Sequence, residues 1–255
     1  MKKWFWFVFV PFFCMADEPA SEPEVTEKIN ILGSTQTACW VNMDTPYANA
    51  TVRGNTFMYG VRAFYDLHDP KHHIESYISF FVADGSNDFR LCGDDGNASP
   101  SNEGTLKFLE VRVDSGYEFT LEDVMMTPRL MVTLANFEAN RTQNSIKTKY
   151  LLMGMNCKLE TPIRSWYTVS LTPGIFLSDI FEERFGERDV WMQQTEYVYP
   201  KTNSRSIGAE LQGAASFRFG AENQYVIQVN PFIQALRFDQ RFFMYGVGLT
   251  AGYAF

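Results

Sequence analysis

The sequence lacks any run of about 20 apolar residues, so it contains no candidate for a membrane-spanning helix. Positive charge is also scarce, because 22 Lys and Arg stand against 30 Asp and Glu and give a formal net charge of −8. Nucleic-acid-binding proteins usually have the opposite balance, so no nucleic-acid partner is expected. Hydrophobic residues nonetheless make up 45% of the 255 residues, which excludes a disordered chain.

The motifs of common enzymes are missing as well. The chain has no G-x-S-x-G, no H-E-x-x-H and no phosphate-binding P-loop. All three histidines, His68, His72 and His73, fall in one polar segment around Pro70, which indicates a tight turn rather than a metal site. We expect no enzyme activity, no cofactor and no metal ion.

The first 27 residues differ from the rest of the chain. Lys2 and Lys3 precede an apolar stretch over residues 4–15 with a small residue after it, which predicts a signal peptide over residues 1–16. Residues 17–27 are acidic and contain two prolines, as in a solvated leader. Residues 28–255 would form the folded domain. Its three cysteines, Cys39, Cys92 and Cys157, allow at most one disulfide, and the sequence leaves the pairing open.

The last strand carries the clearest pattern. Large apolar residues alternate with small ones from Phe243 to Phe255, so one face is aromatic and aliphatic and the other is nearly bare. A terminal strand that ends on an aromatic residue resembles the closing strand of bacterial outer-membrane barrels, which the barrel-assembly machinery recognises. Tyr253 and Phe255 are therefore the candidate assembly signal. An ordinary strand of a soluble sandwich is the alternative.

Similar alternation recurs along the chain and predicts an all-β fold, a closed antiparallel transmembrane β-barrel in contact with outer-membrane lipid. Bacterial single-chain barrels have an even number of strands, so eleven candidates imply that one strand is missed or one is false. We expect about 12 strands, with 10 as the alternative, and the missed strand in 173–188 or 117–125. The candidates are 29–41, 53–67, 73–83, 105–114, 128–138, 146–158, 163–172, 189–199, 205–219, 224–236 and 242–255.

Charged and aromatic residues on the polar faces of these strands point to the function. Acids and arginines on facing strands would line a water-filled lumen, and aromatic rings between them would offer flat surfaces to a planar solute. We therefore predict an outer-membrane channel for passive diffusion of a small-molecule solute. The alternative is a closed structural or adhesive barrel that acts through loops such as 84–104. The candidate lumen residues are Arg62, Phe64, Tyr77, Phe108, Glu110, Arg112, Glu210 and Arg218.

The order of several segments resembles the nucleoside-specific outer-membrane channel family of the Tsx type. The resemblance implies a monomeric barrel of twelve strands whose narrow lumen binds nucleosides through aromatic and ionisable side chains. Of the candidate lumen residues, it extends to Glu110 and Arg112. The segments are Asn30-Ile31-Leu32-Gly33-Ser34, 55–65, 77–82, Phe108-Leu109-Glu110-Val111-Arg112, Met153-Gly154-Met155, Glu160-Thr161-Pro162 and Gly252-Tyr253-Ala254-Phe255.

Overall fold

The computed structural model describes residues 30–47, 50–86, 89–93, 104–122, 124–141, 144–161, 167–188, 195–198, 205–220, 223–238 and 241–255. The expected signal peptide over 1–16 and leader over 17–27 lie outside these residues, as does most of the 84–104 loop. No helix among the described residues is long and apolar enough to cross a membrane. Cys39 is buried and Cys157 half-buried, and both are free thiols.

Ten long antiparallel strands close into a barrel, and each pairs with two neighbours. The circle closes because β1 pairs with β2 on one side and with β13 on the other. Three short strands extend it: β4 pairs with β2, β6 with β7 and β10 with β9. The long strands are β1 (Ile31–Tyr47), β2 (Ala50–Asp69), β3 (Ile74–Ser86), β5 (Gly104–Tyr117), β7 (Val124–Arg141), β8 (Asn144–Glu160), β9 (Tyr167–Arg188), β11 (Arg205–Phe219), β12 (Tyr225–Arg237) and β13 (Phe242–Ala254), and the short ones are β4 (Arg90–Gly93), β6 (Phe119–Leu121) and β10 (Thr195–Val198).

The expected all-β barrel is confirmed, but the preferred count of twelve strands is wrong and the alternative of ten holds. The expected strand 163–172 and the presumed missing strand in 173–188 are one element, β9, which runs straight through Pro173 and Gly174. A proline followed by a glycine usually marks a turn. Here Pro173 lies on the outer face, and Gly174 leaves room for Glu210 on the inner face. Of the expected strand 189–199, the described residues form β10, and the segment 117–125 holds the short β6 between the end of β5 and the start of β7.

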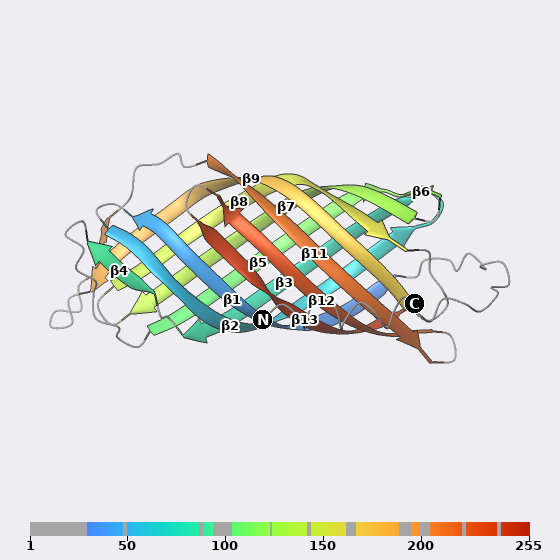
Figure 1. Cartoon of the computed structure of the whole chain (residues 1–255), viewed down its shortest axis with the longest axis horizontal. Coiled ribbons are helices and arrows are strands. Elements are labelled where there is room, and N and C mark those ends of the chain that lie inside the picture. The colour runs from blue at the N-terminus through green and yellow to red at the C-terminus, as the bar shows by residue number, and fades with distance from the viewer. Residues whose placement is uncertain are drawn as a thin grey trace, which may run out of the picture.

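The two ends of the barrel differ, as Figure 1 shows. One end, called here the terminus end, holds the start of β1, the end of β13 and the connections β2–β3, β5–β7, β8–β9 and β11–β12. The opposite end, the loop end, holds the two longest connections, 87–103 and 189–204, together with β4 and β10. In Figure 1, β6 and the C-terminus lie at the terminus end and β4 lies at the loop end.

Apolar side chains cover a band on the outer face. Aromatic rings gather at both edges of this band: Trp40 packs on Phe57 and Tyr245 at one, and Tyr65, Tyr253 and Phe255 stack at the other. From Leu32, which pairs with Tyr65, to Trp40, β1 rises about 27 Å. At a strand tilt of roughly 40° this separates the edges by about 20 Å along the barrel axis.

The polarity of the two faces exchanges toward the loop end, while the period of two continues unbroken, as β5 illustrates. Nearer the terminus end, Val111 is outside while Glu110 and Arg112 are inside. Nearer the loop end, Lys107 is outside and Phe108 is inside. β7 changes in the same way. The barrel is therefore polar inside and apolar outside over the band, and apolar inside and polar outside beyond it.

Candidate solute-binding cavity

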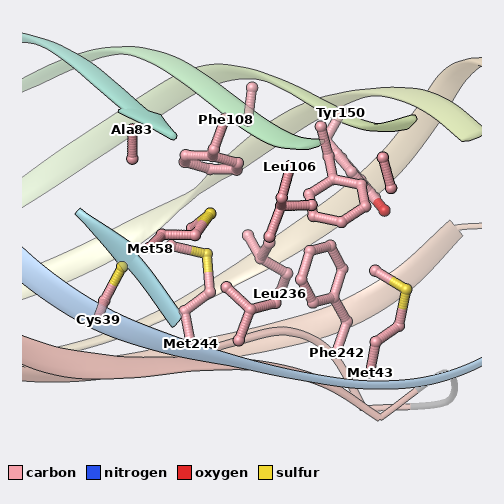
Figure 2. Close-up of a cluster of buried hydrophobic side chains, with 14 of the residues drawn as sticks. Cys39, Met43, Met58, Ala83, Leu106, Phe108, Tyr150, Leu236, Phe242 and Met244 are labelled. Carbon is pink, nitrogen blue, oxygen red and sulfur yellow. The ribbon is translucent and has the colours of Figure 1, made fainter. Parts of the chain in front are cut away.

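A cluster of apolar side chains fills the interior toward the loop end. Phe137 and Phe242 meet edge to face with ring centroids 5.1 Å apart, and Tyr150 packs on Phe242. Figure 2 shows side chains of this cluster pointing toward one another from facing walls of the barrel. Such packing excludes water from this part of the bore. The cluster contains Cys39, Val41, Met43, Met58, Phe81, Ala83, Phe89, Leu106, Phe108, Met131, Ala135, Phe137, Ala139, Ile146, Tyr150, Leu152, Phe176, Leu236, Phe242 and Met244.

On the terminus-end side of this cluster, an ion pair crosses the bore. Arg112 on β5 donates to both carboxylate oxygens of Glu210 on β11, at 2.7 Å each. Between these two strands lie three strands on one side of the barrel and five on the other, so the pair joins nearly opposite walls. The same guanidinium donates to Asp114 at 2.8–3.0 Å, and the side chain is only 3% exposed.

A second group of charges lies nearer the terminus end. Lys158 contacts the carboxylates of Glu75 and Glu160 at 2.9 Å each. Arg129 lies 3.5 Å from Glu75 and donates to the side-chain oxygen of Asn156 at 2.8 Å. Since Asn156 also donates to Asp114, the two charged groups form one network across β3, β5, β7, β8 and β11. Burying charges is costly unless they are paired and hydrogen-bonded, and this network meets that condition.

An aromatic surface lies beside the charges. Phe64 on β2 and Tyr77 on β3 stack with centroids 5.7 Å apart and an interplanar angle of 25°. Gly33 on the neighbouring β1 makes room for this arrangement, because a Cβ there would lie 2.6 Å from Cζ of Phe64. Arg62 lies 4.9 Å from the centroid of Phe81 and donates to Glu110 at 3.0 Å. Flat rings next to a paired guanidinium and carboxylate suit a planar solute with polar groups.

These side chains surround a cavity of about 190 Å³. It extends from Phe81 and Met244 of the apolar cluster to His68 and Arg218, near the terminus end. Its lining is chemically uneven: the charges come mainly from β2, β3, β5, β7 and β8. The lining residues of β1, β12 and β13 are uncharged and form what we call the neutral arc.

The structure places all eight candidate lumen residues inside the barrel. Arg62, Phe64, Tyr77, Glu110, Arg112 and Arg218 line the cavity. The other two have different surroundings: Phe108 belongs to the apolar cluster, and the carboxylate of Glu210 is held by Arg112. Phe108 therefore lies outside the cavity lining, because it is the next inward residue after Glu110 toward the loop end, where the interior of the barrel is apolar.

The histidines do not all lie in a turn. Pro70, His72 and His73 do form the β2–β3 connection. His68, however, is part of β2, lines the cavity and lies 3.1 Å from Glu118. The expectation of three turn histidines is thus wrong for His68, because β2 extends two residues further than its apolar pattern indicated. Among the described residues, no group of three or more His, Cys, Asp or Glu could hold a metal ion.

Sequence reasoning missed the second charged group. Four charged residues line the cavity from strands for which the sequence analysis gave ranges but no inward residues. They are Glu75, Arg129, Lys158 and Glu160. Glu160 lies two residues beyond the expected end of its strand, β8, at residue 158. The available signal was the spacing of Asn156, Lys158 and Glu160, three polar residues at every second position after the apolar Met153 and Met155.

No protein-family model matches the chain, and no curated protein matches it. Among solved structures, it is similar to the beta domain of the Bordetella autotransporter Brka, with a TM-score of 0.45 and 9% identity over 89% of this chain and 99% of that chain. A major outer membrane protein from Thermus thermophilus gives 0.39 and 12% over 88% and 99%. Ail, the attachment invasion locus protein of Yersinia pestis, gives 0.36 and 11% over 89% and 99%. At this low identity and structural overlap, none of these likenesses assigns a function to the chain.

Proposed function

We propose that the protein is a bacterial outer-membrane β-barrel that binds a small planar solute in its polar cavity, with its axial path closed in this conformation. The observation that carries the proposal is the polarity of the band: its outer face is apolar between two aromatic edges, and the inner face at the same level is charged. Water-soluble proteins rarely expose so continuous an apolar surface. An apolar outer band flanked by aromatic girdles and a polar interior is typical of barrels in the outer membrane.

The connections suggest the orientation. Outer-membrane barrels have short periplasmic turns and longer extracellular loops. The loop end would therefore face the exterior and the terminus end the periplasm. In this orientation the apolar cluster closes the extracellular side, and the cavity is reached from the periplasmic side.

A nucleoside is the solute that we test first. Its base would lie on the Phe64–Tyr77 surface, and its hydroxyl groups would meet the polar residues around Arg62 and Glu110. The cavity volume of about 190 Å³ is below the range of typical ligand pockets, so a small solute is favoured. Passive conduction of nucleosides, as in Tsx-type channels, would require the apolar cluster and the Arg112–Glu210 pair to separate.

Binding is measured by titration calorimetry of the refolded protein in detergent with uridine and adenosine. Phe64→Ala should weaken binding by about twofold to twelvefold, since an aromatic stacking contact contributes about 0.5–1.5 kcal/mol. The matched control is Phe80→Ala, which removes an equal ring from the outer face. Equal loss in the two variants, or no binding by the unmodified protein, contradicts a nucleoside site.

The closed axis is measured separately in planar bilayers. The unmodified protein should give no steady conductance, because the apolar cluster excludes ions from the bore. A steady conductance that nucleosides block would instead support the open channel of the Tsx type.

A closed barrel that acts through its loops is the second candidate, and the apolar cluster beneath the loop end favours it. Ligand or surface binding that survives Glu110→Gln but is lost on deletion of residues 94–103 would distinguish this function from solute binding in the cavity.

A further inference from the structure

The wall of the barrel is interrupted between β11 and β12. Their pairing runs to Gln212 with Phe232 and resumes at Ala215 with Val229 in the same register. The two intervening positions, Gly213 opposite Pro231 and Ala214 opposite Asn230, are unpaired. Proline has no N–H to donate, so it removes a rung of the ladder. The ladders on either side run through this level, since Ala214 pairs with Ser170 on β9 and Pro231 pairs with Val247 on β13.

The cavity reaches into this interruption. On β2, β5 and β9 only alternate residues line it, as expected when side chains of one face point inward. On β11 and β12, by contrast, consecutive residues line it, from Gln212 to Ala214 and from Asn230 to Gln234. These runs include Gly213, Pro231 and Ile233, which belong to the outer face. The cavity therefore contacts residues of both faces of the wall at this point.

A second proline provides an internal comparison. Pro173 on β9 interrupts the β8–β9 ladder in the same way, since pairing stops at Asn156 with Gly174 and resumes at Leu159 with Leu171. There the cavity is lined only by inward residues such as Thr172 and Lys158. A missing hydrogen bond alone is thus insufficient. At Pro231 the facing residue is Gly213, which has no side chain, so the ring of Pro231 itself lies over this position, with its Cγ 3.3 Å from where a Cβ of residue 213 would be. Ala214 next to it has only a methyl group.

The chemistry on either side of the gap defines what can pass. Outside, Val229, Pro231 and Leu211 belong to the apolar band, between Tyr225 at one aromatic edge and Ile233, the neighbour of Tyr245, at the other. Inside, the gap opens beside the neutral arc, where Gln228, Asn230 and Gln234 offer amide groups. Amides donate and accept hydrogen bonds without requiring a charge on the ligand.

We propose that the gap at Gly213–Ala214 and Asn230–Pro231 is a lateral passage through which a small, neutral, lipid-soluble molecule with hydrogen-bonding groups moves between the bilayer and the cavity. The inference rests on the proposed membrane location of the barrel. It adds a second entrance to the cavity, besides the aqueous one at the terminus end, and it gives the neutral arc a role as the surface that receives the molecule's polar groups.

The test uses a bimane fluorophore on single cysteines, in protein without Cys39, Cys92 and Cys157 that is refolded into phosphatidylcholine vesicles. One label replaces Ala214, at the inner mouth of the passage, and one replaces Ala215, on the outer face. The nitroxide TEMPO is the neutral, lipid-soluble probe, and iodide is the charged probe that is confined to water. TEMPO should quench the Ala214 label as strongly as the Ala215 label, and iodide should quench only the Ala214 label.

Pro231→Val restores the missing N–H donor and should close the passage. TEMPO quenching of the Ala214 label should then fall, while iodide quenching stays because the aqueous entrance is unchanged. Pro173→Val is the matched control and should change neither. The proposal is overturned if Pro231→Val leaves TEMPO quenching unchanged or lowers the quenching by both probes equally. If iodide also quenches the Ala215 label, the membrane location itself fails, which is a distinct result.

Discussion

The ion pair across the bore makes a quantitative prediction about stability. Arg112→Leu would leave Asp114 and Glu210 buried without their cation. Removing one partner of a buried ion pair costs about 3–5 kcal/mol, because the remaining charge stays desolvated and unpaired. Here two carboxylates lose the same partner and five hydrogen bonds, so we expect a loss at the upper end of that range.

The matched control is Arg205→Leu. Arg205 also makes two hydrogen bonds to a carboxylate, that of Asp179, but it is exposed at the loop end. An exposed ion pair contributes about 0–1 kcal/mol. The contrast between the two variants therefore isolates burial rather than the loss of an arginine.

Unfolding free energies are measured by urea titration of protein refolded in phospholipid vesicles, followed by tryptophan fluorescence. The triple variant Arg112→Leu, Asp114→Leu, Glu210→Leu should recover most of the lost stability, since replacing a whole buried ionic group by apolar residues is often neutral or stabilising. If Arg112→Leu costs no more than Arg205→Leu, the bore is hydrated at this level and the description of a closed axis is wrong.

Three further predictions concern the outer face, the aromatic surface and a turn. Val132→Arg, within the apolar band, should lower the free energy of unfolding in a bilayer by about 2–4 kcal/mol. Asn136→Arg, beyond the band, should lower it by at most about 1 kcal/mol. Equal urea midpoints for the two variants would contradict a lipid-facing band. Gly33→Val should displace the ring of Phe64 and weaken nucleoside binding in calorimetry while the protein still folds, and unchanged affinity would show that the stack has no part in binding. The hydrogen bond from His72 lowers the pKa of Asp69. This turn should therefore stabilise the protein fully at pH values above the ordinary pKa of an aspartate. The contribution should be lost as the pH falls through the lowered pKa of Asp69. In ¹³C NMR titrations, His72→Ala should raise the pKa of Asp69, and an unchanged titration curve would disprove the contact.

Much of the wall was predictable from the sequence, because a period of two assigns each residue to a face once the strand is recognised. This held for Arg62 and Phe64 on β2 and for Glu110 and Arg112 on β5. The number of strands was harder to predict, because Pro173 and Gly174 carry a turn signal. Unbroken pairing with β11, and pairing with β8 before and after Pro173, override this signal. Local propensity is a weak guide where a strand is held on both sides.

The state of the bore was not predictable in the same way. The pairing of Arg112 with Glu210 joins residues 98 positions apart and depends on the circumference of the barrel. The exchange of polarity in β5 is visible in the sequence, where two apolar residues, Phe108 and Leu109, stand between Lys107 and Glu110. The sequence does not show on which side of this point the charged residues face inward, because charged and apolar residues alternate on both sides of it. The position of Phe108 within the apolar cluster identifies the inward face of β5 at this level.

In the proposed membrane location, the exchange of polarity between the inner and outer faces also fixes how deeply the barrel can sit in a bilayer. If it moved toward the periplasm by one residue pair along each strand, Lys107, Asn136 and Lys149 would enter hydrocarbon. A shift in the other direction would bring Leu109 and Leu134, the first apolar residues inside the band, into water. Both displacements are opposed, so the immersion depth has a single minimum. A thinner or thicker host membrane would then have to deform around this protein, because charged residues next to the band prevent the barrel from changing its depth.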